Sequence, residues 1–543
     1  MRKRTMKRLL GMTLALCLIA GCGQSGGESA ESVQEAAEST VQSAAEESNG
    51  EKDTFQIAVT KHALSTTDDF NEMEAFKMAE EATGVHIEWI YVQGETADEK
   101  ISTMMSADPP DAFLGLMNES RIGTNMDLFV DLSGMLKEYA PHVAADYEAA
   151  QDGKGMELVT WPDGSIRSLM TSLEVNYEND PDGIMMINKN WLDQLGLSIP
   201  ETTDELYEVL CAFRDNDMNG NGDPGDEIPL ELCENNWAAH VLNMANPWGI
   251  SGKSSTNVSH FYKVQDGVVM PTLDTEEFRA FLEYMNRLAS EGLMDVEAFT
   301  QTNDQYYAKL KSGAVGVWFA WTPYSVMSEE LSEQYVTMRI PSADGITPVK
   351  SGERNRLYAN RTGFAITTAC EKPERLLEWW DYLSSSTEIK WTMRFGPQGG
   401  YWDINDEGTV YLKTPENLTD TFTIENYKYT YGMVDACTFI RADEACEVDE
   451  EVAFTTWYRI DSVDQVWDQL ATEYTPARFV DGEKTDERTF METELTPYVD
   501  NFIATSIVDG IDDAKWEAHL SQLEALQYYD WIQWYQDYTD GKF

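Results

Sequence analysis

The sequence predicts an α/β protein of two interlocked lobes, each a mainly parallel sheet covered by helices, with a helical C-terminal region. Three observations support this fold class. Strands and helices alternate regularly over residues 55–116, and a second series of short apolar runs and amphipathic helices follows over residues 183–384. Residues 447–543 then read mostly as amphipathic helix rich in Trp and Tyr. Alternation of strand and helix is typical of parallel sheets, because parallel neighbours need a crossover connection.

The first 22 residues form a targeting segment that precedes the fold. Five cations are followed by an apolar run over residues 9–20 and by the tetrapeptide Ile-Ala-Gly-Cys that ends at Cys22. The apolar run is too short for a resident membrane span. The segment resembles a bacterial lipoprotein signal, which implies that Cys22 is lipidated and becomes the first residue of the mature chain. The alternative is an ordinary secretory signal in which Cys22 is incidental.

Residues 23–53 consist of Gly, Ser, Glu, Gln and Ala with almost no large apolar side chain. Such a composition buries too little surface to order itself, so we expect a disordered tether. Beyond it the sequence contains no other apolar run long enough to cross a bilayer. We therefore expect a globular domain that a flexible tether attaches to the extracellular face of the cell membrane.

The charge of the chain limits its partners. The full sequence has 39 basic and 96 acidic residues, and removal of the signal leaves 34 basic residues and a net charge of about −62. Nucleic acid is therefore excluded as a natural partner, because its phosphates are bound by neutralisation with Lys and Arg. Adhesion to anionic lipid by charge is also disfavoured, so the lipid must hold the protein at the membrane.

The first folded stretch alternates strand and helix. We predict strands at residues 55–59, 85–92 and 111–116, with helices at residues 70–83 and 97–107 between them. Ligands of such sheets lie outside the carboxyl ends of the strands. The loops after the first and third strands are therefore expected at a binding site, with Lys61, Asn118 and Arg121 as available polar side chains.

The middle of the chain contains a capped helix that leads into an acidic loop. Residues 166–174 and 183–188 look extended and carry the chain from one lobe to the other. Thr202 and Glu205 then form a capping box, with a serine or threonine at the helix start and an acid three residues on. The helix that they open has Leu206, Leu210 and Phe213 on one face and runs directly into residues 215–229.

Residues 215–229 predict a calcium loop. Ca²⁺ takes six to eight oxygen ligands, which such loops supply from short carboxylates and amides at alternate positions, with Gly at the sharp turn. Two registers fit, and Asp217, Asn219, Asn221, Asp223 and Asp226 contribute to both. The first register starts at Asp215, and the second starts at Asp217 and adds Glu227. The alternative is a solvated Gly/Asn/Asp turn without an ion.

The cysteines and histidines do not indicate a zinc or redox site. Five cysteines remain after Cys22, an odd number that excludes a complete disulfide framework. Cys211 and Cys233 flank the calcium loop and are expected either to form a bridge or to be buried thiols. The chain has no C-x-x-C motif, and its six His residues are far apart in sequence.

The later elements end in loops that carry aromatic side chains. A long amphipathic helix over residues 278–292 precedes a buried strand in the stretch 313–323, which contains Trp318 and Trp321. Residues 357–368 are extended and hold Arg361, and a helix is predicted at residues 373–384. A Gly-rich loop then leads to Tyr401 and Trp402, followed by an Asn-Asp-Glu-Gly hairpin turn.

No catalytic constellation stands out. The sequence has neither the G-x-S-x-G elbow of serine hydrolases nor the H-E-x-x-H of zinc peptidases. A glycosidase needs only two carboxylates at the right separation, and among 96 acids no pair can be chosen.

Several stretches are similar to the family 1 extracellular solute-binding lipoproteins of bacterial sugar ABC importers. They are N-E-M-E-A-F-K-M-A-E-E-A-T-G-V-H-I-E-W, M-M-S-A-D-P-P-D-A-F, I-N-K-N-W-L-D-Q-L-G-L-S-I-P-E-T-T-D-E-L, the calcium loop, G-A-V-G-V-W-F-A-W and F-G-P-Q-G-G-Y-W-D-I-N-D-E-G. The resemblance implies a periplasmic-binding-protein-like fold of two hinged lobes, which close on an oligosaccharide and present it to a membrane permease. It also implies that the protein is not an enzyme. Some relatives carry calcium at a D-x-N-G-N-G-x-x-D-E loop, whereas this chain has one extra residue before Asp226 and Glu227.

The resemblance also indicates ligand-binding residues. Trp318 and Trp321 occupy the stretch in which sugar-binding relatives place a stacking aromatic side chain. Further candidates are Trp237, Trp248, Arg361, Tyr401 and Trp402. Flat aromatic walls suit sugars, whose rings have apolar C–H faces. For each of the aromatic residues, the alternative is a place in the hydrophobic core.

The sequence thus predicts six segments. They are a signal at 1–22, a tether at 23–53, the first lobe at 54–175 with a return at 341–440, the second lobe with the calcium loop at 176–340, and its helical C-terminal part at 441–543. The predicted function is capture of a carbohydrate by a monomeric receptor that serves an ABC importer. The alternatives are a surface-tethered carbohydrate hydrolase and a calcium-stabilised adhesin.

Overall fold

The structure is a computed structural model that describes residues 52–94, 96–175, 183–252, 260–343, 345–353, 357–419 and 421–543. The predicted signal, Cys22 and nearly all of the predicted tether lie outside these residues. The chain divides into the units Met1–Lys52 and Asp53–Phe543, and the elements described below belong to the second unit. Asp53, the last residue of the predicted tether, is the first residue of strand β1.

The first sheet contains five strands in the order β2-β1-β3-β12-β4. Their bounds are β2 Val85–Val92, β1 Asp53–Thr60, β3 Ala112–Leu114, β12 Asn360–Ile366 and β4 Leu169–Thr171. β1 pairs in parallel with β2 and β3, whereas β12 is antiparallel to both β3 and β4. Strand β12 therefore inserts between β3 and β4, although it begins at residue 360 and they end at residues 114 and 171.

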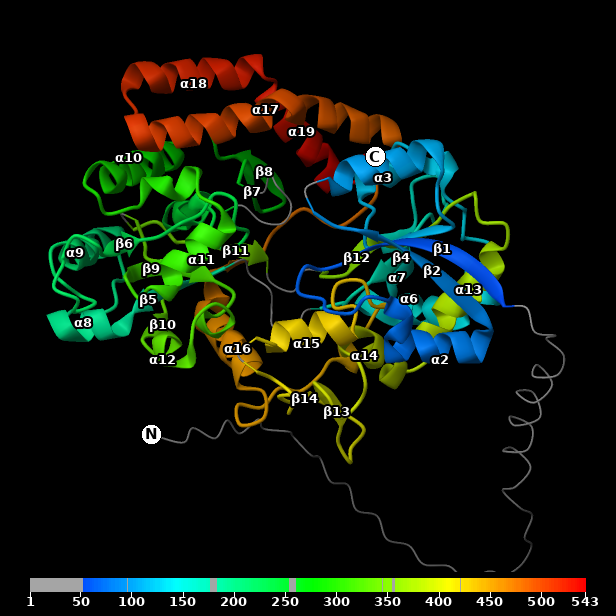
Figure 1. Cartoon of the computed structure of the whole chain (residues 1–543). Helices are drawn as coiled ribbons and strands as arrows, with labels where there is room; N and C mark the ends of the chain where they lie inside the picture. Colours follow the sequence, from blue (N-terminus) through cyan, green and yellow to red (C-terminus); the bar gives the residue numbers. More distant parts are fainter. Residues whose placement is uncertain are drawn as a thin grey trace, which may run out of the picture. The chain divides into compact units, whose positions relative to one another are not determined.

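The second sheet contains four strands in the order β10-β5-β9-β6. Their bounds are β10 Tyr335–Thr337, β5 Ile184–Asn188, β9 Val315–Ala320 and β6 Ile228–Leu230. β5 is antiparallel to β10 and β9, and β6 is parallel to β9. Figure 1 shows the two sheets as separate centres, each with its own helices.

The α/β fold class is confirmed, but the sheets are mixed instead of mainly parallel. In each sheet one strand runs against the others. These strands are β5 and β12, and each is the first strand of its sheet that the chain reaches after leaving the other sheet. Period-two alternation reports which face a strand buries and not its direction, so the sequence pattern could not reveal this reversal.

Side chains alternate across the first sheet and build a core on each face. Ile57 and Leu114 belong to one cluster, which includes helices α2 Glu74–Thr83, α13 Pro373–Leu383 and α14 Thr387–Phe395. Ala58, Phe113 and Ala365 belong to another cluster, with Ile101 of α3 Ala97–Ala107. Helices thus cover both faces, as an α/β sheet requires.

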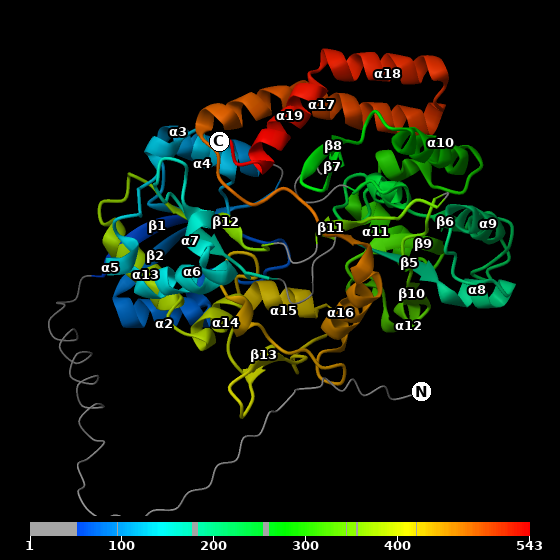
Figure 2. The ribbon, with the colours of Figure 1, turned by 180° about the vertical axis from the view of Figure 1, so that it is seen from behind.

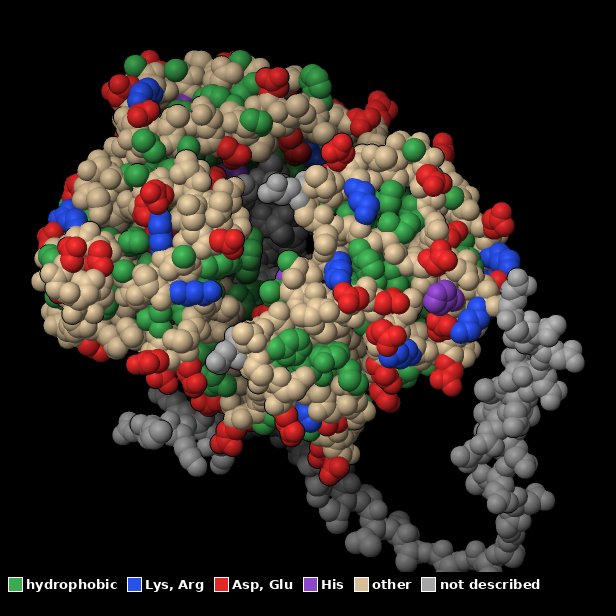
Figure 3. All heavy atoms as spheres, viewed as in Figure 1, with side chains coloured by type: hydrophobic (Ala, Val, Ile, Leu, Met, Phe, Trp, Pro, Cys, Tyr) green, Lys and Arg blue, Asp and Glu red, His purple; other side chains and the backbone are tan. Residues whose placement is uncertain are grey.

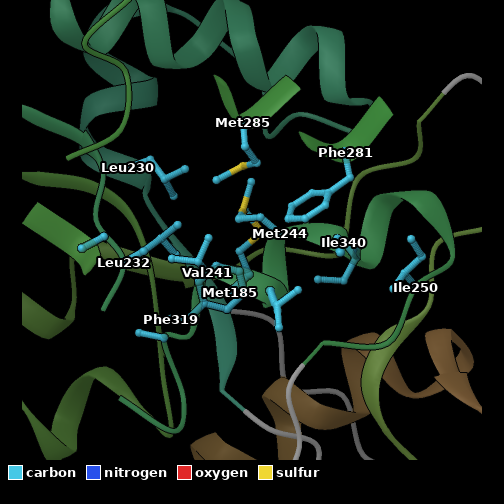
Figure 4. Close-up of a cluster of buried hydrophobic side chains, with 14 of the residues drawn as sticks. Met185, Leu230, Leu232, Val241, Met244, Ile250, Phe281, Met285, Phe319 and Ile340 are labelled. Carbon is cyan, nitrogen blue, oxygen red and sulfur yellow. The ribbon is translucent and has the colours of Figure 1, made fainter. Parts of the chain in front are cut away.

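The core of the second sheet is a continuous apolar cluster. Figure 4 shows side chains from β5, β6 and β9 meeting those of η3 Val241–Trp248 and α10 Glu276–Ser290. Met185, Leu230, Met244, Phe281 and Met285 are among them, and each is at most 2% exposed. The cluster continues into the C-terminal helices, through residues such as Leu495 of α17 Gly482–Asp509.

The C-terminal helices contact elements around both sheets. α17 packs against α10, which covers the second sheet, and against α4 Glu119–Gly123, which follows β3 of the first. Helices α18 Asp513–Ala525 and α19 Tyr528–Thr539 complete the region, drawn in red and orange in Figure 2. The sequence assigned residues 441–543 to the second lobe alone, and the contact with α4 adds a link to the first sheet.

The remaining elements connect these layers. Their bounds are η1 Phe70–Glu72, η2 Met126–Leu128, α5 Leu136–Tyr139, α6 Pro141–Gly153, α7 Gly155–Val159, α8 Lys189–Leu195, α9 Thr203–Arg214, β7 Tyr262–Gln265, β8 Val268–Pro271, η4 Val296–Phe299, α11 Asn303–Lys311, η5 Pro323–Ser325, α12 Glu329–Ser332, β11 Lys350–Glu353, β13 Trp402–Ile404, β14 Val410–Leu412, α15 Ile424–Tyr431, η6 Ala442–Glu444, α16 Phe454–Val466, η7 Trp467–Gln469 and β15 Leu470–Ala471. Among the described helices, none combines the length and the apolar character that a membrane span needs.

Candidate functional site

Two tryptophans predicted as ligand-binding residues meet at the surface of the second-sheet region. The ring centres of Trp237 and Trp321 are 5.9 Å apart, and their planes are inclined by 55°. Trp237 is 53% exposed, the most of any Trp in the described part of the chain, and Trp321 is half-buried. The pair thus offers accessible aromatic surface to a ligand.

Trp237 stands on a short loop that is closed by backbone hydrogen bonds. The Cys233 amide donates to the Ala239 carbonyl at 2.9 Å, and the Asn236 amide donates to the Cys233 carbonyl at 3.0 Å. The buried Asn236 side chain accepts from the Ala238 and Ala239 amides and donates to Asn303. Because the loop is held from within, the side chain of Trp237 is turned outward.

Trp321 comes directly after the last residue of β9 and is held by Arg459 of α16. The guanidinium carbon of Arg459 lies 3.9 Å from the centre of the Trp321 ring. The same guanidinium donates from Nη1 to the Trp321 carbonyl oxygen at 3.2 Å. Arg459 is fully buried, so it acts on Trp321 from the protein side.

The aromatic surface continues beyond the pair. Tyr324, three residues after Trp321, makes edge contacts with Phe454 and Tyr458 of α16, each at 5.1 Å between ring centres. Phe454 is 39% exposed. On the face drawn in Figure 3 the surface is hollowed beside the elements of the second sheet, and hydrophobic side chains line that side of the hollow.

A carboxylate lies near this surface. Glu234 is three residues before Trp237, and its Oε1 is 2.9 Å from Nε2 of His240. The Leu242 amide donates to Nδ1 of His240, so the proton of the neutral ring is on Nε2. The second oxygen of Glu234 is buried and has no hydrogen-bond partner among the residues that the structure describes. No sequence motif distinguishes Glu234, Tyr324, Phe454 or Arg459 from other acidic, aromatic and basic residues, so none of them could be predicted as a site residue.

Four other predicted aromatic residues are core side chains. Trp318 on β9 is fully buried and packs edge-on against Tyr335, at 5.4 Å between ring centres. Trp248 is 6% exposed and contacts Phe281 and Tyr284. Burial supports the alternative interpretation for both, because a ligand cannot reach a ring that is enclosed on all sides.

Tyr401 and Trp402 are also completely buried. The Tyr401 hydroxyl is 2.8 Å from the Thr456 hydroxyl of α16, and Nε1 of Trp402 donates to the Gly396 carbonyl at 2.7 Å. Their polar atoms thus have partners within the protein, as buried tyrosine and tryptophan generally require.

Arg361 has a structural environment. Its side chain is 7% exposed and forms an ion pair with Glu119 of α4. Its guanidinium carbon lies 4.2 Å from the ring centre of Phe479, and Nη2 donates to the Arg478 carbonyl. The opposite neighbour of Phe479 is Trp161, stacked at 4.1 Å. Arg361 therefore anchors the chain that enters α17.

The three polar residues predicted at the ends of the first-sheet strands also have protein partners. Lys61 lies over the ring of Tyr91 at 5.4 Å, and Arg121 forms an ion pair with Asp98. The Asn118 side chain caps α4 by accepting from the Arg121 amide. Among the described residues, no contact joins these three side chains to Trp237 or Trp321.

The predicted calcium loop is organised around Asp217. One oxygen of its carboxylate accepts from the Gly220 amide and the other from the Gly222 amide, both at 2.8 Å. Both glycines have positive φ, +75° and +91°, which a loop wrapping round a central carboxylate demands. The Asn219 and Asn221 side chains donate to the two oxygens of Asp226 at 3.1 and 2.6 Å.

These contacts distinguish the two calcium registers. Asp215 turns away from the loop and forms an ion pair with Arg214. Glu227 turns inward, where Oε1 accepts from the Met218 and Asn219 amides and Oε2 is buried without a hydrogen-bond partner in the described part of the chain. Gly220 is the sixth residue of the first register and Gly222 is the sixth residue of the second, so the glycine that calcium loops need at this position fits both registers. The loop conformation therefore matches the register that begins at Asp217 and includes Glu227.

The donor set of this loop fits a hard cation. Carboxylates, amide oxygens and backbone carbonyls are the ligands that Ca²⁺ prefers, and one oxygen of Glu227 is buried without a hydrogen-bond partner among the described residues. Within the described residues no three His, Cys, Asp or Glu side chains come close enough to form a metal cluster by themselves. The loop would thus depend on Asn219, Asn221 and the backbone as much as on carboxylates.

The two cysteines that flank the loop are not bridged. Cys211 is a half-buried free thiol, and Cys233 is a fully buried one. Of the two expectations, a disulfide bridge or buried thiols, the second therefore describes Cys233. Cys211 is only partly buried.

Comparison with known proteins identifies the family. The profile of the bacterial extracellular solute-binding proteins matches residues 63–390. The chain is 26% identical over 512 residues to the fructooligosaccharide ABC transporter substrate-binding protein FusA of Streptococcus pneumoniae, and the match covers 90% of each chain.

Solved structures agree on the fold. FusA of S. pneumoniae in complex with kestose has a TM-score of 0.78 at 24% identity, and the alignment covers 90% of this chain and 99% of that one. An EF-hand mutant of FusA in complex with fructo-nystose gives the same TM-score at 23% identity and the same coverage. The family profile spans more than half of the sequence, and the mixed sheets with their helical C-terminal region agree with it: the chain belongs to the bacterial extracellular solute-binding proteins.

Proposed function

We propose that this protein captures an oligosaccharide outside the cell at the Trp237–Trp321 pair and delivers it unaltered to the permease of an ABC importer. The observation that carries the proposal is the exposed aromatic pair itself. Sugar rings bury their apolar C–H faces on aromatic rings, while a few polar groups bind the hydroxyls. Glu234 is the carboxylate nearest to Trp237 in the sequence of this loop and is proposed as an acceptor for such hydroxyls.

The relatives support the carbohydrate class. FusA is named for fructooligosaccharides and has been solved with kestose, and its match extends over nine-tenths of this chain. The family and these relatives are binding proteins, which favours capture over hydrolysis. The proposed anchor is a lipid on Cys22, which would keep the protein at the extracellular face of the membrane near its permease.

We also propose a structural Ca²⁺ in the loop that joins α9 to β6. Asp217, Asn219, Asn221, Asp226 and Glu227 would hold it together with the Asp223 carbonyl oxygen. The ion would neutralise the acidic loop and tie the end of α9 to the start of β6. The loop conformation and the unpartnered oxygen of Glu227 support this assignment.

Calorimetric titration with kestose, fructo-nystose and other neutral oligosaccharides tests the proposed function. We expect wild-type protein to bind at least one of them, and Trp237→Ala and Trp321→Ala each to weaken that binding by tenfold or more. Phe490→Ala is the matched control, because Phe490 is an exposed aromatic side chain, 74% accessible, on α17. It should bind as the wild type does.

Two results would contradict the proposal. The first is unchanged affinity in both tryptophan variants, which would place the ligand elsewhere. The second is release of reducing ends from an oligosaccharide by purified protein, which would favour the alternative of a surface-tethered hydrolase.

A further inference from the structure

We infer that Arg459 is a positioning residue for ligand binding: it fixes the ring of Trp321 and thereby sets the affinity of the site without touching the ligand. The inference rests on the proposed function, since it assumes that Trp321 contacts the ligand. Arg459 lies 138 residues after Trp321, on α16, and belongs to no motif that the sequence displays.

Arg459 holds Trp321 at two points. Its guanidinium carbon lies 3.9 Å from the centre of the indole, and its Nη1 donates to the carbonyl oxygen of the same residue at 3.2 Å. A planar guanidinium can stack on an aromatic face and donate from its edge at once, which a lysine ammonium cannot reproduce. The ring plane and the backbone of Trp321 are thus fixed by one group.

Trp321 needs such a support because it lies beyond its strand. β9 ends at Ala320, and the ring of Trp321 contacts that of Trp237, which is itself more than half exposed. The two rings are inclined by 55° with centres 5.9 Å apart, so they do not form a parallel stack. With Arg459 against it from the protein side, Trp321 keeps its remaining surface for a ligand. A ring that is already ordered costs less entropy to bind against.

The helix that carries Arg459 is fixed on two sides. Ser462 of α16 is hydrogen-bonded to Thr337 of β10 at 2.8 Å, which attaches the helix to the edge of the second sheet. Thr456 in its first turn is 2.8 Å from the hydroxyl of the buried Tyr401, which belongs to the core of the first sheet. Tyr401, predicted as a ligand-binding residue, therefore acts in this structure as a support of α16.

The test compares Arg459→Gln and Arg459→Lys with the control Ser462→Ala. Ser462 is 1% exposed on the same helix, and its loss weakens the attachment of α16 without removing a contact to Trp321. Affinity for the oligosaccharide that the wild type binds best should fall about tenfold in Arg459→Gln. The affinity of Arg459→Lys should fall less than that of Arg459→Gln, because lysine keeps the positive charge although it loses the planar contact. Ser462→Ala should stay within about twofold of the wild type.

A second readout follows the ring itself. The protein is labelled with 5-fluorotryptophan, and the ¹⁹F resonances of Trp321 and Trp237 are assigned from Trp321→Phe and Trp237→Phe. In the ligand-free protein, Arg459→Gln should shift or broaden the Trp321 resonance and leave those of buried tryptophans such as Trp318 in place. Ser462→Ala should leave the Trp321 resonance unchanged.

An unchanged Trp321 resonance in Arg459→Gln would overturn the inference, and so would equal effects of Arg459→Gln and Ser462→Ala on both readouts. If no oligosaccharide binds the wild type, the proposed function fails. The fluorine measurement still decides whether Arg459 fixes Trp321, because it needs no ligand. If Arg459→Gln does not fold, Arg459→Lys is compared with Ser462→Ala instead, in both affinity and the Trp321 resonance.

Discussion

Trp318 and Trp321 are three residues apart and have opposite environments. Trp318 points into the core from β9 and is fully buried, whereas Trp321 follows the end of the strand and reaches the surface. Their local sequence is almost the same, a run of small and aromatic residues. The difference arises from the strand end, because every residue of β9 is buried along the strand, whereas Trp321 lies beyond its last residue.

Substitution should separate these two roles. Trp318→Ala is expected to lower the free energy of unfolding by about 3–5 kcal/mol, because it leaves a large cavity in a close-packed core. Trp321→Ala should change the stability by less than about 1 kcal/mol and weaken ligand binding. Urea denaturation and calorimetric titration of both variants measure the two effects. The same loss of stability in both would show that Trp321 is a core residue.

His519 makes the stability depend on pH. Its Nδ1 accepts from the Tyr498 hydroxyl and its Nε2 donates to the Leu273 carbonyl, both at 2.9 Å, and its ring stacks on Phe502 at 3.8 Å. Burial lowers the pKa of His519 to about 4, because the charged form loses its hydration. The unfolded chain therefore binds a proton more readily than the native protein between about pH 6.5 and pH 4.

Over that interval the wild type should lose up to about 3 kcal/mol of stability through His519, since one pKa unit corresponds to about 1.4 kcal/mol. The loss begins as the pH falls below 6.5 and is complete near pH 4. His519→Gln keeps a donor and an acceptor but no titration. The difference in stability between wild type and variant should therefore shrink on acidification, as measured by urea denaturation from pH 4 to pH 8. A difference that does not change with pH would contradict the assignment.

Helix α9 is capped at its start by side chains and leads at its end into the predicted calcium loop. At its start Thr202 accepts from the Glu205 amide, and Glu205 accepts from the Thr202 amide, which confirms the predicted capping box. At its end the chain passes through Asp215 into the Asp217-centred loop and continues into β6. The loop thus stands between a packed helix and an edge strand of the second sheet.

Removal of calcium should destabilise this element. An ion bound only by the native state stabilises it by mass action, about 2.7 kcal/mol when the free ion is a hundredfold above its dissociation constant. A chelator should therefore lower the melting temperature of the wild type. In Glu227→Gln, which keeps the shape but lowers the charge of the ligand set, the effect should be smaller.

Asp215→Asn is the control for that experiment, because Asp215 is ion-paired outside the loop. It should respond to the chelator as the wild type does. An unchanged melt of the wild type, with no metal retained after purification, would contradict the calcium site and leave the alternative of a solvated turn.

At the scale of the whole molecule, the chain passes between the two sheets more than once, and the C-terminal helices link them. Phe479 lies between the stacked ring of Trp161 and the guanidinium of Arg361, both from the first-sheet region. α17, which begins three residues later, packs against α10 on the second sheet. Any movement of one sheet relative to the other must be accommodated by this helix.

We expect ligand binding to make the protein more compact. A ligand that contacts groups around both sheets gains more in a closed arrangement and shifts the population toward it. Small-angle scattering should show a smaller radius of gyration with the bound oligosaccharide than without it. Trp321→Ala at the same oligosaccharide concentration should keep the larger value. An identical radius in all samples would favour a rigid receptor and contradict the predicted hinge.

The sequence by itself determined the fold class, most element positions, the capping box and the existence of the acidic loop. These features depend on local patterns: Val85–Val92 and Pro373–Leu383 follow from hydrophobic periodicity and helix signals, and the loop from its spacing of Asp, Asn and Gly. The resemblance of several stretches to a known family was also readable, and the family is confirmed.

Only the tertiary structure decided strand direction, burial and contacts between distant residues. It reversed β5 and β12 within their sheets, separated Trp321 from Trp318, and brought Trp237 and Arg459 to Trp321 from 84 residues before it and 138 residues after it. It also turned Glu227 inward, which favours the proposed register that begins at Asp217. The physical reason is that a local pattern records which side of a strand or helix is apolar, whereas the identity of the neighbour on that side is set by how the whole chain packs.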